Sequence, residues 1–166
     1  GYMEALTDPS YNGQILMFTF PTIGNYGVDQ KNFQHPRVWA NGCVAREICP
    51  APDHQPSFLR YFEDNGLSGI QGVDTRALTR HIRDHGAQEG VISTMDLDPE
   101  SLVKRAKASP GLIGRDLVRE VSCLAPCTWS KGAMQSGLPA RKSSRRLRVV
   151  VLDCGVKYNI LRLLEN

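Results

Sequence analysis

The sequence has no long hydrophobic run, no secretory signal pattern at its start, and an odd number of cysteines. None of its apolar stretches approaches the about 20 consecutive residues that a membrane-spanning helix needs, so we expect no membrane partner. Five cysteines without a signal peptide indicate reduced thiols in a cytoplasmic protein rather than a disulfide framework.

The cysteines and histidines also lack the close spacing of a structural zinc site. The pairs Cys43/Cys49 and Cys123/Cys127 do not have the two-residue spacer of zinc knuckles. His81 and His85 could bind a metal from one face of a helix, but no acidic third ligand follows at helical spacing. Because histidines near a helix C-terminus also interact well with the helix dipole, we predict a structural pair and no metal site.

Charge of one sign is scarce as well, since the formal net charge is only +3. Most of the excess lies in the basic run 141–148, which has no interleaved aromatic residues and no nucleic-acid-binding motif. Such a run next to serine, glycine and proline is typical of a solvated linker. We therefore predict a linker over residues 134–147 and no nucleic-acid partner.

What is present is a globular composition, with 41% apolar and 22% charged residues. A chain of 166 residues makes about one domain, or one domain with a piece of another. Because it begins inside a motif-rich stretch and stops inside a helical pattern, we expect a fragment of a longer protein.

The first 27 residues contain a strand pattern, 14–20, between two turns. Residues 7–10, Thr-Asp-Pro-Ser, form a turn because proline fixes its own φ and restricts the residue before it. Residues 24–27, Gly-Asn-Tyr-Gly, form a second turn that can take positive φ. The small polar side chains indicate either a binding rim or an ordinary strand with ordinary turns.

Further along, strand and helix patterns alternate. Strand patterns cover the second half of 37–48 and residues 91–94, and residues 69–73 look like a short apolar connection. Helical patterns cover 57–65, 75–85, 98–109 and 116–121, with Ser57, Asp74 and Asp98 as N-caps. Leu102, Val103 and Ala106 are predicted to form the buried face of the third of these helices.

The last segment has the pattern that opens a doubly wound α/β domain. Residues 147–153, LRVVVLD, are a nearly unbroken apolar run, as in a strand buried on both faces of a parallel sheet. A tight turn at Cys154-Gly155 and a helix over 156–164 follow. Trp129, just before the linker, is predicted to anchor a loop by packing inward.

Several long sequence words resemble one family in the same order. They are GYMEALTDPSYNGQI followed by PTIGNYG, then GVDTRALTR, GAQEG and LDCGVKYNI. Together they resemble the small, glutamine-hydrolysing chain of carbamoyl-phosphate synthetase along nearly the whole sequence. The resemblance implies an α/β protein: a small-chain N-terminal domain of the swivelling β/β/α type over 1–133, the linker 134–147, and the first β–α unit of a class I amidotransferase domain over 148–166.

The resemblance also implies the chemistry. The family hydrolyses glutamine with a cysteine on a Gly-x-Cys-x-Gly turn, helped by a histidine and a glutamate. This sequence has no such turn, so we expect no catalytic residue and no glutaminase activity from this chain alone. Cys154, which ends the first strand of that domain, is expected to be a buried structural thiol. Ser10 corresponds to the family serine that contacts glutamine, although it could instead bond its own turn.

The implied partner is a large synthetase subunit, or synthetase domains fused to this chain. It makes carbamoyl phosphate from bicarbonate and ATP for arginine biosynthesis, pyrimidine biosynthesis or both. ATP and Mg²⁺ would bind that partner, and we expect no cofactor in this chain. Arg76, Arg80 and Arg83 either dock the partner or form a solvated helix face. A non-catalytic, stand-alone interaction module with the same fold is the alternative function.

Overall fold

The computed structural model describes residues 1–129 and 147–165. In this part of the chain the strands form two parallel sheets, a three-stranded sheet of order β1-β3-β5 and a two-stranded sheet of order β2-β4. The strands are β1 (Ile15–Met17), β2 (Thr22–Ile23), β3 (Gly42–Val44), β4 (Glu47–Ile48) and β5 (Ser68–Ile70). Strands and helices mix along the chain, which confirms the predicted α/β class.

The central register aligns Leu16 of β1 with Cys43 of β3 and Gly69 of β5. β1 is shorter than the predicted strand 14–20: the Phe18 N–H still donates to the Val44 carbonyl at 2.9 Å, but Phe20 is exposed. The strand predicted in the second half of 37–48 is confirmed by β3 and β4. β5 occupies what the sequence indicated to be a connection.

The helices are α1 (Tyr2–Leu6), α2 (Phe58–Asp64), α3 (Thr75–His85), α4 (Pro99–Lys107), α5 (Leu117–Val121) and α6 (Tyr158–Glu165). Short 3₁₀ turns cover Pro9–Tyr11 and Gln30–Asn32. The N-caps predicted for α2, α3 and α4 are confirmed, because the side chains of Ser57, Asp74 and Asp98 each accept a backbone N–H of the first turn. α1 was not predicted.

One hydrophobic core joins α1, α2 and the sheets. Its buried members are Tyr2, Met3, Leu6, Leu16, Ile23, Val28, Ala40, Cys43, Ala45, Phe58, Phe62 and Leu67. The Phe62 ring covers the sheet face that contains Gly69, where a Cβ would lie 2.7 Å from the ring. Ile92 covers Gly42 in the same way, with its side chain 3.1 Å from where a Cβ would lie.

Three predictions about these helices and strands are wrong. Residues 91–94 form no strand, because Ile92 packs its side chain over Gly42 instead of joining a ladder. Residues 147–153 form no strand either: no described strand pairs with them, and Val150 and Leu152 are 90% and 88% exposed. The predicted buried face of α4 is also wrong: Val103 is exposed, and Leu102 and Ala106 are only half-buried.

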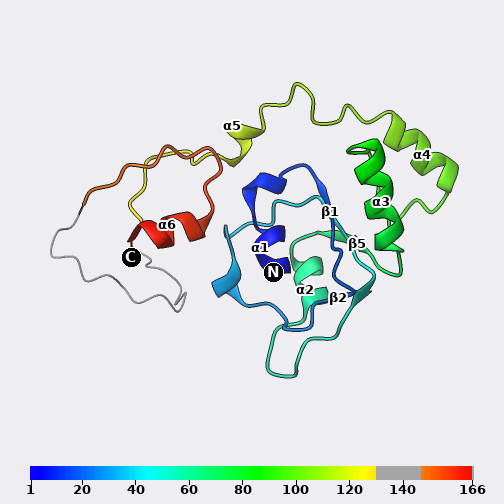
Figure 1. The fold of residues 1–166 in the computed structure, drawn as a ribbon, viewed down its shortest axis with the longest axis horizontal. Coiled ribbons are helices and arrows are strands. Elements are labelled where there is room, and N and C mark those ends of the chain that lie inside the picture. The colour runs from blue at the N-terminus through cyan, green and yellow to red at the C-terminus, as the bar shows by residue number, and fades with distance from the viewer. Residues whose placement is uncertain (130–146, 166) are drawn as a thin grey trace.

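The elements are spread along the long axis of the molecule. Figure 1 shows α3 and α4 at one end, α6 at the other, and the strands with α1 and α2 between them. Among the described residues, no helix is long and apolar enough to cross a membrane. The predicted linker lies outside the described residues except for Leu147, as does the basic run up to Arg146.

Candidate functional site

The turn that carries Ser10 is closed by the side chain of Asp8. Asp8 Oδ1 accepts the Ser10 N–H at 2.9 Å, and Pro9 begins the 3₁₀ turn Pro9–Tyr11. Ser10 is exposed, and its carbonyl accepts the Gln14 Nε2–H at 3.1 Å. Within the described residues the Ser10 hydroxyl makes no hydrogen bond, so the carboxylate rather than this hydroxyl stabilises the turn.

A second turn, residues 153–157, lies directly against the first. Lys157 Nζ is 2.7 Å from Asp8 Oδ2, and the Asp8 side chain is only 7% exposed. Gly155 has φ +99°, and a Cβ there would lie 3.3 Å from the Cβ of Pro9. The two turns therefore touch at consecutive residues, and Ser10 is the next residue along the first turn.

Asp153 organises the second turn. Its Oδ1 accepts the N–H groups of Gly155 and Val156, both at 2.8 Å, and its Oδ2 accepts the Cys123 N–H at 2.9 Å. Partial burial pushes the pKa of Asp153 upward, but the N–H groups of Val156, Gly155 and Cys123 outweigh it and lower the pKa below its ordinary value. Asp153 therefore stays ionised and holds the turn.

A row of aromatic rings extends the contact between the same two parts of the chain. Trp129 packs on Tyr158 with ring centroids 4.7 Å apart, Tyr158 on His35 at 5.8 Å, and His35 on Trp39 at 5.0 Å. The anchoring role predicted for Trp129 is thereby confirmed. Burial and the Arg37 charge lower the pKa of His35, which favours the neutral ring in this row.

The other predicted site residues lie elsewhere or differ from expectation. Cys154 is exposed, so the prediction of a buried thiol is wrong, because residues 147–152 do not form the sheet that would cover it. Arg76, Arg80 and Arg83 are exposed on α3, at the opposite end of the molecule from α6 (Figure 1).

His81 and His85 stack at 4.3 Å, and His85 Nδ1 lies 2.9 Å from the His81 carbonyl. The two histidines therefore contact each other and the backbone of α3. In residues 1–129 and 147–165, no group of three or more His, Cys, Asp or Glu side chains is arranged to hold a metal ion.

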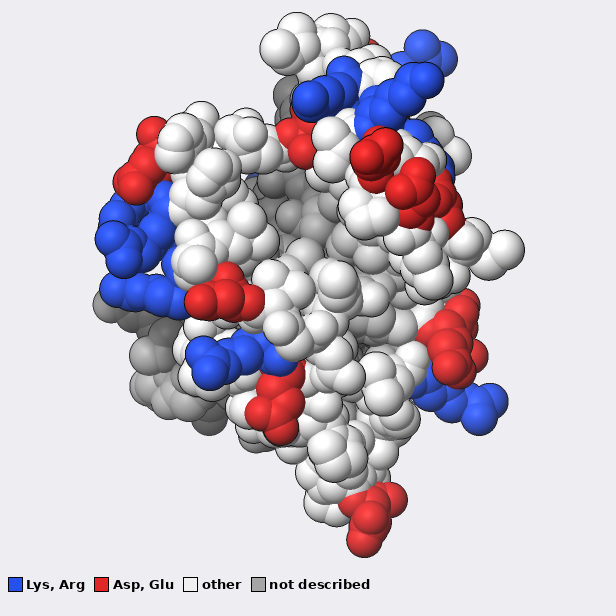
Figure 2. All heavy atoms as spheres, turned by 90° about the vertical axis from the view of Figure 1, so that its right-hand side faces the viewer, with Lys and Arg blue, Asp and Glu red and all other residues white. Residues whose placement is uncertain are grey.

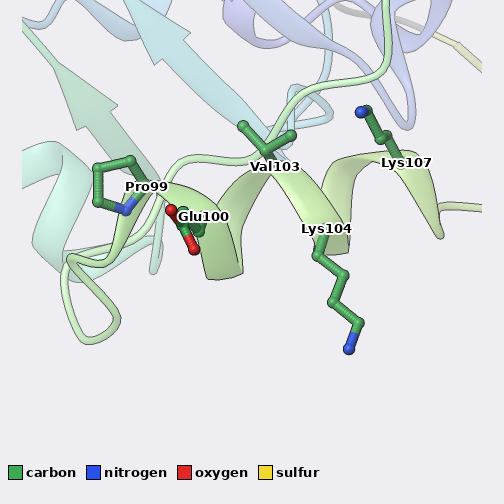
Figure 3. A pocket seen from close by; sticks show the side chains of 5 residues that line it. All are labelled: Pro99, Glu100, Val103, Lys104 and Lys107. Carbon is green, nitrogen blue, oxygen red and sulfur yellow. The ribbon is translucent and has the colours of Figure 1, made fainter.

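An open hollow of about 500 Å³ lies along α4. Its five lining side chains all come from this helix, and Val103 and Lys107 point to one side while Lys104 points to the other (Figure 3). Polar groups therefore do not converge on a common point, as they do in a catalytic pocket. Figure 2 shows both signs of charge scattered over the face that α3 and α4 occupy, with neutral surface between them.

The sequence predicts a role for Ser10, which stays a prediction, but it does not predict the contact between Asp8 and Lys157. From the sequence alone, Asp8 is a turn residue and Lys157 is part of a motif that resembles the family. Their contact joins positions far apart in the chain, so no local pattern could have shown it. The nearest available signal was that both residues stand in the words that resemble one family.

Comparison with known proteins agrees with the resemblance that these sequence motifs indicate. The family model described as carbamoyl-phosphate synthase small chain, CPSase domain, matches residues 1–92. Curated proteins named carbamoyl phosphate synthase small chain are similar to the chain in Syntrophotalea carbinolica (47% identity, 98% of this chain and 44% of the relative), in a Nostoc species (44%, 100% and 45%) and in Methanosarcina mazei (42%, 99% and 45%).

The chain thus spans less than half the length of these relatives, although they match it almost from end to end. The family model covers the part that contains α1, α2, the sheets and the Ser10 turn. On both grounds, the chain belongs to the carbamoyl-phosphate synthase small-chain family.

Proposed function

We propose that this chain is part of the glutamine-hydrolysing small chain of a carbamoyl-phosphate synthase, and that Ser10 contacts the glutamine substrate. The observation that carries the proposal is the exposed Ser10 hydroxyl on a turn that the Asp8 carboxylate already closes. A hydroxyl both donates and accepts hydrogen bonds, so it suits the α-ammonium or α-carboxylate of an amino acid. The second turn, against Pro9, would place neighbouring groups of the amidotransferase domain beside that substrate.

Hydrolysis of the glutamine amide needs a nucleophile, a base and oxyanion donors. The sequence contains no Gly-x-Cys-x-Gly turn. We therefore propose that the chain alone does not hydrolyse glutamine, and that residues 1–133 act as a binding and docking domain, residues 134–147 as a linker, and residues 148–166 as the start of the amidotransferase domain.

The ammonia would pass to a large synthetase subunit or to fused synthetase domains that hold ATP and Mg²⁺. This would take place in the cytoplasm and serve arginine biosynthesis, pyrimidine biosynthesis or both. The exposed arginines of α3, Arg76, Arg80 and Arg83, offer a docking face for that partner. Arg83 already contacts Asp84, with Nε 3.4 Å from Oδ1, so Arg76 and Arg80 are the better test positions. If the face docks, the double substitution Arg76→Gln/Arg80→Gln lowers the affinity for the large subunit, whereas a merely solvated face leaves it unchanged.

The test of the glutamine contact uses the full-length small chain together with its synthetase partner. Ser10→Ala should raise KM for glutamine by roughly tenfold, as expected for a lost hydrogen bond to a charged group. Ser57→Ala is the control, because it removes the N-cap of α2 and lowers stability without touching the site. An unchanged KM and kcat for Ser10→Ala would overturn the substrate contact and favour a docking module without a role in substrate binding.

A further inference from the structure

Gln34 joins two parts of the chain that lie 125 positions apart. Its backbone carbonyl accepts the Tyr158 N–H at 2.9 Å, and its side-chain Oε1 accepts the Asn159 N–H at 3.1 Å. These two donors belong to the first turn of α6, where N–H groups have no partner within the helix. Gln34, only 3% exposed, therefore acts as the N-cap of a helix to which it does not belong.

Gln34 is itself fixed to the turn that carries Ser10. The Gln34 N–H donates to Thr7 Oγ1 at 2.9 Å, and the Thr7 hydroxyl donates to the Met3 carbonyl at 2.7 Å, both in buried surroundings. Three consecutive residues thus connect the Ser10 turn to the C-terminal part of the chain. Thr7 does so indirectly, because it holds Gln34. Asp8 pairs with Lys157, and Pro9 lies against Gly155. Ser10 is the next residue.

We propose that Gln34 is a positioning residue for the glutamine site, which sets the separation between the Ser10 turn and the turn 153–157. The proposal rests on the proposed function for Ser10. Lys157 alone could not fix this separation, because it is a flexible side chain that is 43% exposed. Gln34, which is buried and anchored, accepts two hydrogen bonds from the helix that follows the turn and so holds the turn in one place.

The first test measures the cap directly, by hydrogen–deuterium exchange of the α6 amides in the full-length small chain. Gln34→Met keeps the side-chain size but loses the Oε1 acceptor, so exchange at Asn159 should rise by roughly fivefold, the effect of losing one N-cap bond. Gln34→Glu keeps an acceptor oxygen at a helix N-terminus but loses the Nε2–H donor to the Asn32 carbonyl, so its exchange should be slower than that of Gln34→Met. Gln30→Met, an exposed glutamine in the neighbouring 3₁₀ turn, is the matched control. Unchanged exchange in Gln34→Met would overturn the proposal.

The second test measures the effect of Gln34 on the glutamine site through the KM for glutamine. With the synthetase partner present, Gln34→Met should raise KM for glutamine by roughly fivefold and change kcat by less than about twofold, since the chemical groups are intact. Gln34→Glu should give a KM closer to wild type than Gln34→Met does. Carbamoyl phosphate synthesis from added ammonia should not change in either variant, because the partner carries it out. A merely structural role would lower stability in Gln34→Met and leave the KM unchanged, which would overturn the positioning role.

The two proposals fail in different ways. If Ser10→Ala leaves the KM unchanged, the substrate contact is wrong and the positioning role falls with it, whatever the exchange data show. If Ser10→Ala raises the KM and Gln34→Met does not, the substrate contact stands and only the role of Gln34 is overturned.

Discussion

Lys157 Nζ lies 2.7 Å from Asp8 Oδ2, and the two partners differ sharply in burial. The Asp8 side chain is 7% exposed, whereas that of Lys157 is 43% exposed. Loss of one partner should therefore cost more than loss of the other, because a carboxylate left behind is buried and an ammonium left behind can be hydrated.

We predict that Lys157→Met lowers the free energy of unfolding by about 2 kcal/mol and Asp8→Asn by about 1 kcal/mol, since the asparagine side chain would keep an oxygen for the Ser10 N–H. Thermal or urea unfolding of the full-length chain measures both. Lys107→Met on the exposed face of α4 is the control and should change little. Equal losses for the two partners would contradict the argument.

Stability should fall at alkaline pH because of Cys43. Burial raises the pKa of the Cys43 thiol from 9.0 to about 12, so the folded protein binds this proton more tightly than the unfolded chain. The contribution is complete below about pH 9 and is lost as the pH rises from there toward 12. Burial likewise raises the pKa of Tyr2 and Tyr61 from 10.0 to about 12, which steepens the loss above pH 10.

The measurement is the melting temperature as a function of pH for the wild type and Cys43→Ala. The variant should be less stable at about pH 7, because it leaves a cavity, but should lose less on going from about pH 9 to about pH 10. Cys154→Ala, at an exposed thiol, should follow the wild-type profile. A parallel profile for Cys43→Ala would show that the thiol does not cause the alkaline loss.

Gly24 should tolerate a side chain less well than Gly66. Both have positive φ, +87° and +61°, but a Cβ at Gly24 would lie 2.9 Å from the Cys49 carbonyl oxygen, while nothing lies within 4 Å at Gly66. We expect about 1 kcal/mol of destabilisation for Gly66→Ala and about 3 kcal/mol for Gly24→Ala, as measured by unfolding. Similar losses would mean that the backbone at Gly24 can shift away from Cys49.

Phe58 should be the most sensitive aromatic position of α2. It is 1% exposed and packs on Tyr2 and Phe62 with ring centroids 4.7 Å from each. Phe58→Ala should therefore cost about 4 kcal/mol, whereas Leu59→Ala, at a side chain that is 51% exposed, should cost about 1 kcal/mol or less. A comparison of the melting temperatures of the two variants tests this. Equal shifts would contradict the prediction that Phe58 contributes more to core packing than Leu59 does.

Local chemistry predicted the elements whose signals are local. Ser57, Asp74 and Asp98 end up as caps because an N-cap depends on the next three residues alone. β5 was missed because its central Gly69 has a low strand propensity, and only pairing with Cys43 makes it a strand.

The opposite error occurred at 147–153, where strand propensity is high but no described strand pairs with the segment. In the candidate site, too, local sequence signals and long-range contacts play different parts. The sequence motifs single out Ser10 as a candidate, whereas the surroundings of Ser10 depend on the contacts of Asp8 with Lys157 and of Thr7 with Gln34. These contacts arise only when distant segments fold together.

The capping of α6 by Gln34 also imposes an order on folding. Ribosomes release the N-terminal residues first, so Thr7 and Gln34 can form their bond long before Tyr158 and Asn159 are synthesised. An 8-residue helix is too short to be stable in water on its own. We therefore expect the first part of the chain to serve as a template, with α6 becoming helical as its first amides meet an acceptor that is already in place.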